Sequence, residues 1–424
     1  MNADDRIDQQ IRAALDWQAE RDARRAPSLL QSTQAVASRL GRRRSGAGTV
    51  VVFRQGSTSG LPVALLLLLL VALLTIGIGL GSGLVQVPSR MVTPPFGLAA
   101  NGQVAYDNTG DIWLGDPRSG DTRLFLGDPA VERSPTWSLD GTWLAFLRDD
   151  GSGEKLFVVE VDGSGLLELT PDPLLDAGAP KWSPDARSIA IEHTVGGRVG
   201  VSVIRTDGGG VQRIDLDVTA SAPEWRPPDG RQLLIRGVAR TGEPNLYTMA
   251  PDGGGLRSLE LAGSGLDGGV TDFLGASWSP DGRRILYGGL EFRDPISGVN
   301  RYRTHIVNAD STGDSLVEAP EDLSDVWPVW SPDGRFIHFE RVRGEYLGQG
   351  AQVWLAIAAT DGPGLVEITG ISDPGGLEAI WSPDGTRLLA RLGTSAALYE
   401  IDPVSGTVRV LPWTTRRDLS WQRR

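Results

Sequence analysis

The sequence contains no cysteine and very little histidine or lysine. Its 424 residues include three histidines and only two lysines, Lys155 and Lys181, so nearly all cations are arginines. The absence of cysteine excludes disulfides, a thiol nucleophile, a cysteine-based metal site and a lipid anchor on cysteine. The histidines, His193, His305 and His338, show no metal-ligand spacing, so we expect structural roles for them, no metal site and no cofactor.

Charged residues are absent from one long segment near the start of the chain. No charge occurs between Gln55 and Ser89, and residues 61–85 are apolar. A run of this length crosses a bilayer as a helix. A cleaved signal peptide is the alternative, but about 60 residues precede the run and its apolar core is too long. We therefore predict one transmembrane helix over residues 61–85, a linker over 46–60 and a tether over 86–95.

The distribution of charge predicts the orientation of this helix. Five arginines precede it closely (Arg39, Arg42, Arg43, Arg44 and Arg54), whereas only Arg90 follows closely. The positive-inside rule then places the N-terminus in the cytoplasm and the rest outside, as a single-pass protein of a bacterial plasma membrane. Residues 1–60 carry a net charge of +4 in a chain of net charge −12, which leaves −16 for the remainder. We do not expect so acidic a domain to bind nucleic acid.

Residues 1–45 show two short helical patterns, one over residues 7–17 and one over residues 29–40. Two helices of this size cannot bury a core alone, so we expect either a solvated stalk or a tail completed by a partner. A short helical tail, one span and an outer domain together resemble single-pass anti-sigma-factor-like regulators. This resemblance implies a cytoplasmic regulatory partner for residues 1–45.

One short motif recurs along the rest of the chain. Trp-Ser-Pro-Asp-Gly begins at Trp278, Trp330 and Trp381, looser copies begin at Trp137, Trp182 and Trp225, and a truncated copy surrounds Trp421. A repeat of about 47 residues indicates a repeat architecture. Proline, aspartate and glycine in this order favour a tight turn, and an alternating apolar run follows each full copy. We expect the repeated aspartates to cap these turns.

A second motif lies in phase with the first. An aspartate follows another apolar segment and precedes a glycine by three or four residues at Asp116, Asp162, Asp207, Asp252, Asp310, Asp361 and Asp402. Four short strands per period predict a propeller blade. Together the two motifs resemble the TolB-like (WD-like) β-propeller repeat over about residues 96–424. The resemblance implies an all-β propeller, a scaffold that hosts many functions.

The two motifs also predict the number of blades. The sequence contains seven sets of outer strands and seven inner strands that carry the tryptophan. The first outer set has no tryptophan strand before it, and the last tryptophan strand, around Trp421, has no outer set after it. The strand around Trp421 should therefore complete the first blade. This closure removes an open sheet edge. We therefore predict seven blades closed by the C-terminal strand. Six or eight blades also fit, because residues 96–99 resemble a further inner strand.

The connections on one rim of the predicted propeller are longer and more variable than those on the other. Loops of this kind on a rigid scaffold are where binding usually occurs. Arginine and aromatic side chains are typical of binding hot spots. The candidate binding residues of this rim are Phe292, Arg293, Arg301, Trp327, Arg341, Arg343 and Tyr346. In the alternative interpretation Trp327 packs under its loop and the arginines pair with nearby acids.

No catalytic motif stands out. The sequence has no Gly-x-Ser-x-Gly after the repeats, and paired catalytic carboxylates are not visible in it. We therefore expect a protein that is no enzyme: a non-catalytic, membrane-anchored binding or scaffolding module for a protein or ligand at the loop-rich face. A transmembrane regulator with a propeller sensor is the alternative. A propeller hydrolase or lyase is the third hypothesis, and it requires ionisable residues gathered near the central channel.

Overall fold

The computed structural model describes residues 98–424 except 243, 260, 262–272, 294–298, 347, 349, 362–363, 374–375, 393–396 and 416. The predicted tail, linker, transmembrane helix and tether all lie outside the described residues. Among the described residues, no helix is both long and apolar enough to span a membrane. They all belong to the unit that runs from Ser89 to Arg424.

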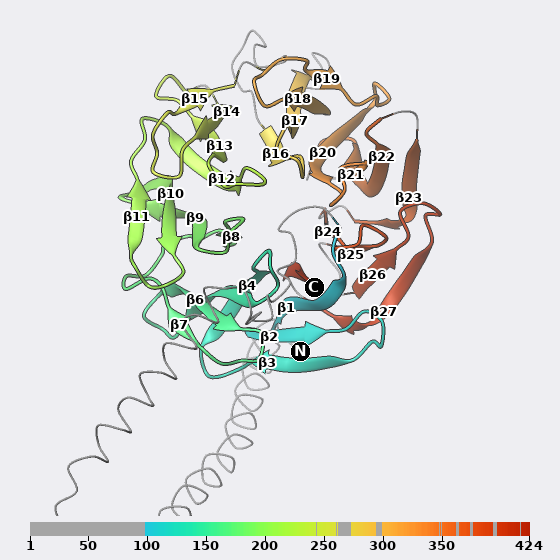
Figure 1. Ribbon diagram of the computed structural model, residues 1–424. Helices are drawn as coiled ribbons and strands as arrows, with labels where there is room; N and C mark the ends of the chain where they lie inside the picture. Colours follow the sequence, from blue (N-terminus) through green and yellow to red (C-terminus); the bar gives the residue numbers. More distant parts are fainter. Residues whose placement is uncertain are drawn as a thin grey trace, which may run out of the picture. The chain divides into compact units, whose positions relative to one another are not determined.

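Seven antiparallel four-stranded sheets surround a central axis (Figure 1). Blade 1 contains β28 (Arg417–Arg423), β1 (Asn101–Asn108), β2 (Asp111–Gly115) and β3 (Thr122–Leu126). Blade 2 contains β4 (Val131–Trp137), β5 (Trp143–Asp149), β6 (Glu154–Glu160) and β7 (Leu167–Glu168). Blade 3 contains β8 (Lys181–Trp182), β9 (Ser188–Val195), β10 (Arg198–Arg205) and β11 (Val211–Ile214).

The other four blades follow the same order from the axis outwards. Blade 4 contains β12 (Thr219–Trp225), β13 (Leu233–Val238), β14 (Pro244–Met249) and β15 (Arg257–Ser258). Blade 5 contains β16 (Phe273–Trp278), β17 (Arg284–Arg293), β18 (Asn300–Asn308) and β19 (Ser315–Leu316). Blade 6 contains β20 (Leu323–Trp330), β21 (Phe336–Arg343), β22 (Gln352–Ala359) and β23 (Leu365–Ser372). Blade 7 contains β24 (Leu377–Trp381), β25 (Leu388–Leu392), β26 (Ala397–Ile401) and β27 (Val408–Thr414).

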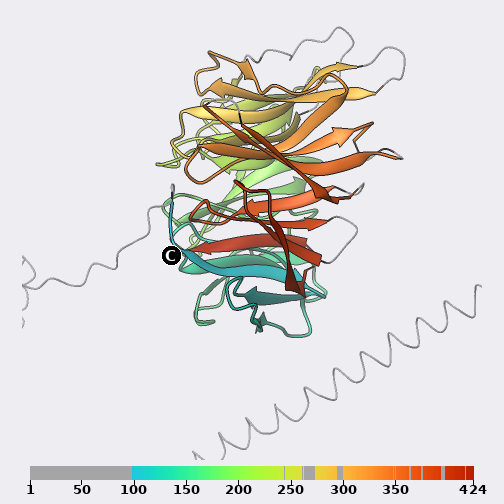
Figure 2. The same ribbon diagram turned by 90° about the vertical axis from the view of Figure 1, so that its right-hand side faces the viewer.

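The C-terminal strand closes the ring as predicted. β28 pairs with β1, with Trp421 opposite Val104, and so completes blade 1 (Figure 2). Asn101 adds a side-chain contact between the first and last blades, because its Nδ2 donates a 2.8 Å hydrogen bond to Asp384 Oδ2. Seven blades and closure by the C-terminal strand are therefore confirmed. Six or eight blades are excluded, since residues 98–100 form no strand.

The Trp-Ser-Pro-Asp-Gly turn is stabilised by its own side chains. In blade 6, Ser331 Oγ donates a 2.7 Å hydrogen bond to Asp333 Oδ1, which also accepts from the Arg335 amide at 3.0 Å. Ser279 with Asp281 and Ser382 with Asp384 repeat the serine–aspartate contact at 2.6 and 2.7 Å. These aspartates thus cap turns, as the sequence predicted.

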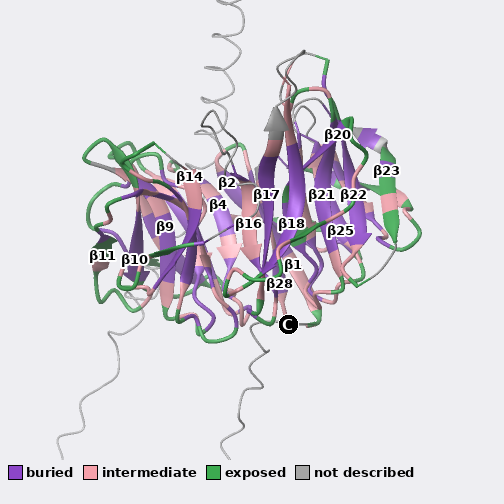
Figure 3. Ribbon diagram, turned by 90° about the horizontal axis from the view of Figure 1, so that it is seen from above, coloured by how far each residue is buried: buried purple, intermediate pink, exposed green. Residues whose placement is uncertain are grey.

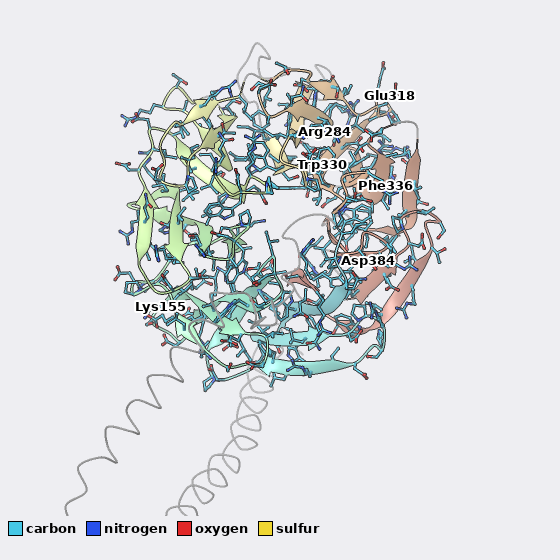
Figure 4. All side chains as sticks on the ribbon, viewed as in Figure 1. Lys155, Arg284, Glu318, Trp330, Phe336 and Asp384 are labelled. Atoms are coloured by element: carbon cyan, nitrogen blue, oxygen red, sulfur yellow. The ribbon has the colours of Figure 1, made fainter. Side chains whose placement is uncertain are left out.

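The repeated tryptophans pack between neighbouring blades. In blade 3, Trp182 Nε1 donates a 2.9 Å hydrogen bond to the Thr136 carbonyl of blade 2. In blade 6 the guanidinium of Arg284, from blade 5, lies 4.9 Å from the Trp330 ring centroid, and Figure 4 labels both residues. Buried residues fill the middle of the blades, whereas exposed residues gather in the connecting loops (Figure 3).

A bulge recurs in the innermost strands, three residues before the repeated tryptophan. The residue there has a positive φ in five blades: Ser134 (53°), Ala222 (48°), Gly275 (83°), Trp327 (54°) and Asp418 (47°). The strand register shifts at each of these positions. Glycine adopts this conformation freely, but a bulky residue such as tryptophan does so only under strain. Trp327 is the bulkiest of the four non-glycine residues held in this conformation.

Candidate functional site

Blades 6 and 7 line a half-open pocket of about 350 Å³ beside their innermost strands. This volume lies within the usual range of small-molecule sites. His338 and Glu340 are two positions apart on β21, so both point toward blade 7. The pocket is lined by Trp327, Val329, His338, Glu340, Tyr346, Leu355, Gly376, Leu377, Glu378, Ala379 and Arg391.

Glu340 places a buried carboxyl in the wall of this pocket, and its residue is only 6% exposed. Oε1 accepts a 3.2 Å hydrogen bond from the backbone amide of Leu377 at the start of β24. Oε2 is buried and makes no direct hydrogen bond among the described residues, although the Tyr346 hydroxyl is close enough to act on the carboxyl. Burial raises the pKa of Glu340 to about 7, and the Leu377 amide and the Tyr346 hydroxyl oppose this rise. A carboxyl with this pKa can both donate and accept a proton at neutral pH.

Tyr346 and Trp327 form another side of the pocket. Trp327 Nε1 donates a 2.9 Å hydrogen bond to Tyr346 Oη. Burial, followed by the nearby Glu340 carboxylate, raises the pKa of Tyr346, so the phenol keeps its proton at neutral pH. A Cβ added to Gly376 would lie 3.3 Å from Tyr346 Oη and 3.4 Å from Glu340 Oε2. The glycine therefore leaves open the space that both polar groups face.

Glu378 and Arg391 provide the charged wall from blade 7. They are opposite each other on β24 and β25, and Arg391 Nε lies 3.2 Å from Glu378 Oε2. Glu378 Oε1 accepts a 2.9 Å hydrogen bond from the Leu419 amide of β28. Burial raises the pKa of Glu378, and the amide and the guanidinium oppose that rise. The only guanidinium lining the described pocket is thus already paired with a carboxylate.

His338 stays neutral in this site. The residue is buried, and burial lowers its pKa to about 3. Its ring centroid lies 5.8 Å from that of Trp381, and its Nδ1 has no hydrogen-bond partner among the described residues. Because the imidazole is uncharged at neutral pH, it does not supply a cation to Glu340.

The predicted rim residues fall into different surroundings. Trp327 and Tyr346 line the pocket. Arg341 lies inside blade 6, 1% exposed, where Nε and Nη2 donate to the two oxygens of Asp325 at 2.8 and 2.9 Å. Arg341 is therefore an interior residue, because its side chain points away from the rim.

The other predicted rim residues lie outside the pocket. Arg343 is largely exposed and lies 3.7 Å from Asp322, and Arg301 donates a 3.2 Å hydrogen bond to the Gly344 carbonyl. Phe292 and Arg293 belong to β17, and their side chains are outside what the structure describes. The structure thus brings together two of the seven predicted residues, Trp327 and Tyr346.

The two remaining histidines lie in other blades. His193 Nε2 is 2.7 Å from Ser202 Oγ within blade 3. His305 Nδ1 is 3.2 Å from Asp314 Oδ1, and its ring stacks on Tyr287 with centroids 4.9 Å apart. Among the residues that the structure describes, no group of three or more histidine, aspartate or glutamate side chains could hold a metal ion.

Sequence reasoning missed Glu340, Glu378 and Arg391. Each looks like an ordinary polar residue in an alternating strand, and they come from two different repeats. One comparison within the sequence could have found Glu340: it lies ten residues after Trp330, and only Glu192, ten residues after Trp182, places a carboxyl at the same point of another repeat. Glu192 Oε2 likewise accepts a backbone hydrogen bond from the next blade, from Ala222 at 2.7 Å.

Comparisons with known proteins give partial matches. No protein-family model matches the chain. The uncharacterized peptidase YuxL of Bacillus subtilis is 30% identical over 89 residues, 21% of this chain and 13% of the relative. Tricorn protease homolog 2 of Streptomyces coelicolor is 30% identical over 192 residues, 43% of this chain and 15% of the relative. The TolB homolog of Chlorobium luteolum is 27% identical over 158 residues, 37% of this chain and 34% of the relative. The matches thus span about a third or less of these relatives.

Several solved structures share the fold at low sequence identity. An oligogalacturonate lyase from Vibrio parahaemolyticus matches with a TM-score of 0.53 and 13% identity over 74% of this chain and 85% of its own. A prolyl endopeptidase matches with a TM-score of 0.53 and 14% identity over 78% and 52%. A puromycin-hydrolyzing peptidase of Mycobacterium tuberculosis matches with a TM-score of 0.51 and 15% identity over 76% and 55%.

These comparisons contradict the functional expectations drawn from the sequence. Two proteins named as peptidase or protease match stretches of this sequence, and a prolyl endopeptidase and a lyase share the fold. The expectation that the protein is no enzyme, but a binding or scaffolding module or else a transmembrane regulator, is therefore wrong. The physical reason lies in the pocket, where ionisable residues of two repeats meet although the sequence separates them. The described part of the chain is a TolB-like seven-bladed β-propeller.

Proposed function

We propose that the protein is a hydrolase whose reaction takes place in the pocket between blades 6 and 7. The observation that carries this proposal is Glu340, a buried carboxyl with one unpartnered oxygen in the pocket. Its pKa of about 7 is typical of a catalytic acid or base rather than of a surface carboxylate. The likeness to named peptidases supports the same class of reaction.

The two carboxyls of the pocket have different surroundings, which divides the acid and base roles between them. Glu340 holds a proton near neutral pH and gives it to the leaving group. Burial raises the pKa of Glu378 as well, but a guanidinium and a backbone amide oppose that rise, so we assign it the role of the base that takes a proton from the attacking water. The Tyr346 hydroxyl, oriented by the indole of Trp327, donates into the space between them.

The proposal is tested with Glu340→Gln and the matched control Glu192→Gln, assayed with fluorogenic amide, ester and glycoside probes. Both carboxyls accept a backbone hydrogen bond from the next blade, but only Glu340 lines this pocket. General acid–base catalysis contributes at least about 100-fold, so Glu340→Gln should lose that much activity and Glu192→Gln almost none. Cleavage of no probe by the parent protein, or equal rates in both variants, would contradict the proposal.

We also propose that residues 61–85 anchor the protein in the plasma membrane, with the propeller outside the cytoplasm. This proposal rests on the charge-free apolar run and the arginines before it. The expected result is that the protein stays in the membrane fraction after carbonate washing, and that added protease reaches the propeller in intact spheroplasts. Release by carbonate would refute the anchor, and protection of the propeller would refute the orientation.

A further inference from the structure

A second half-open cavity lies between blades 2 and 3, which are neighbours in Figure 1. Its volume of about 540 Å³ lies within the usual range of small-molecule sites. Its lining comes from β7 and the segment that follows it in blade 2, and from β9, β11 and the turn before β11 in blade 3. The cavity shares no residue with the pocket of blades 6 and 7.

Ser202 determines which ring nitrogen of His193 carries the proton. Both residues are buried, and Ser202 Oγ lies 2.7 Å from His193 Nε2. This is the only hydrogen bond of the Ser202 side chain among the described residues. Its O–H therefore donates to Nε2, because a buried hydroxyl without an acceptor would be costly. Burial, followed by the charge of Arg213, lowers the pKa of His193, so the ring is neutral and holds its proton on Nδ1. His193 lines the cavity and thus offers it an N–H donor.

Thr170 offers a second donor to the same cavity. The residue is buried, and its Oγ1 accepts a 2.9 Å hydrogen bond from the Leu156 amide. Its own O–H has no acceptor among the described residues. Buried hydroxyl groups normally have a partner, so this O–H requires an acceptor in the cavity, either a ligand or a water molecule.

Arg213 brings a positive charge to these two donors. Its only ion pair among the described residues is with Asp172, where Nη2 and Oδ2 are 3.9 Å apart. The Asp172 side chain is 77% exposed, so this pair is weak. Glu168, the other acid of the lining, is already paired at 3.0 Å with Lys155, which Figure 4 labels. The guanidinium of Arg213 therefore remains available to a ligand.

Thr170, His193 and Arg213 all present donors to one cavity. A group that accepts hydrogen bonds without donating any, such as a carboxylate, satisfies all three. A guanidinium also binds a carboxylate through two parallel hydrogen bonds. We propose that this cavity binds an organic carboxylate, whose oxygens accept from Arg213, His193 and Thr170.

An apolar surface lies beside the donors. Leu169, Leu174 and Val211 line the same cavity and pack in one hydrophobic cluster. A cavity of about 540 Å³ is larger than a bare carboxylate fills, so the ligand carries an alkyl or aromatic body that buries its apolar surface against these side chains. This site lies outside the reaction pocket and does not depend on the proposed function.

Isothermal titration calorimetry of the full chain tests the proposal. The probes are 4-methylpentanoate, its neutral isostere 4-methylpentanamide, and acetate, which lacks the apolar body. The first should bind at least about tenfold more tightly than either of the others, because the amide loses the charge-assisted contacts and acetate loses the apolar ones. Arg213→Gln should weaken that binding by at least about tenfold. The matched control Arg205→Gln changes another exposed arginine of blade 3, outside this cavity, and should leave the affinity unchanged.

The tautomer of His193 tests the donors independently of affinity. Long-range proton–nitrogen NMR spectra distinguish Nδ1–H from Nε2–H imidazoles, and the chain has only three histidines. The signals of His193, identified by their loss in His193→Gln, should show the Nδ1–H form. Ser202→Ala should shift the ring toward the Nε2–H form and weaken the binding of 4-methylpentanoate. An Nε2–H ring in the parent protein would overturn the donor assignment.

The binding results decide the rest. Absence of binding by 4-methylpentanoate overturns the proposal, since the donors then serve water alone. Equal affinities for the carboxylate and the amide, or an affinity that Arg213→Gln does not change, overturn it as well. Acetate bound as tightly as 4-methylpentanoate overturns the apolar body. Glu340→Gln alters the other pocket and should leave the affinity unchanged, and a loss there would place the carboxylate in that pocket instead.

Discussion

The indole Nε1 of Trp327 donates a 2.9 Å hydrogen bond to the phenol oxygen of Tyr346. This contact joins the bulged position of β20 to the connection between β21 and β22. Because the phenol oxygen accepts from the indole, its own O–H is left to donate into the pocket that Glu340 lines. A strained tryptophan thus orients the hydroxyl that faces the candidate acid.

Replacing Tyr346 by phenylalanine tests this relationship. The hydroxyl opposes the rise in the pKa of Glu340, so its removal should raise that pKa further. The alkaline limb of the pH–rate profile should then move to higher pH. The free energy of unfolding should fall by about 1 kcal/mol, because the hydrogen bond from Trp327 to the phenol oxygen is lost. An unchanged limb would show that Tyr346 does not act on Glu340.

Trp327 and Trp330 are three residues apart, and substituting Trp330 should destabilise the protein far more than substituting Trp327. Trp330 is buried between blades, so Trp330→Ala should cost about 3–5 kcal/mol of stability. Trp327 is 37% exposed with a φ of 54°, so in Trp327→Gly the relief of about 1 kcal/mol of strain offsets much of the lost contact. Urea denaturation measures both. A loss in Trp327→Gly as large as in Trp330→Ala would mean that the indole serves packing rather than the site.

The ionisation of Glu340 should also appear in the pH dependence of stability. Its pKa is raised from 4.5 to about 7, so the folded protein holds a proton that the unfolded chain has lost. This contribution is fully present below pH 4.5 and disappears as the pH rises through 7, a change of roughly 3 kcal/mol. Glu340→Gln should therefore match the parent at pH 4 and exceed it at pH 8. Equal stability of the two proteins at both pH values would contradict the raised pKa.

The buried ion pair inside blade 6 should contribute more to stability than a neighbouring arginine on the surface. Arg341 is 1% exposed and pairs with buried Asp325, so Arg341→Met leaves an unpaired carboxylate and should cost about 3–5 kcal/mol. The double variant Arg341→Met/Asp325→Leu should recover most of that loss. Arg343→Ala, two residues along, removes an exposed side chain and should change stability by less than about 0.5 kcal/mol. Failure of the double variant to recover would show that the two residues act independently.

The turns and the blade count could be predicted because their determinants are local. Ser331 and Asp333 bond within one turn, and the same pair recurs in other repeats. The site is different, since Glu340 and Leu377 are 37 positions apart and meet only when two blades pack. The raised pKa of Glu340 is a product of that packing, and nothing in the local sequence encodes it. The bulge was equally hidden, because Ser134, Ala222, Trp327 and Asp418 share no side-chain property.

A substitution that fills the pocket should reduce activity, whereas a comparable glycine substitution outside the pocket should affect stability alone. A Cβ on Gly376 would meet Tyr346 Oη and Glu340 Oε2, and the φ of 86° there disfavours any other residue. Gly376→Ala should therefore reduce kcat/KM for an amide probe and lower stability by about 1 kcal/mol. Gly350 also has a positive φ but open space around it, so Gly350→Ala should carry only the conformational cost. Equal losses of activity in both variants would argue against a reaction in this pocket.

The pH dependence of kcat/KM for a leucine amide probe tests the role of Glu340 most directly, measured for the parent protein, Glu340→Gln and Glu192→Gln. If Glu340 is the proton donor, the parent and Glu192→Gln lose activity as the pH rises through about 7, and Glu340→Gln is at least about 100-fold slower across the range. A parent profile without a limb near pH 7, or a Glu340→Gln variant with the parent's rate, would contradict that role.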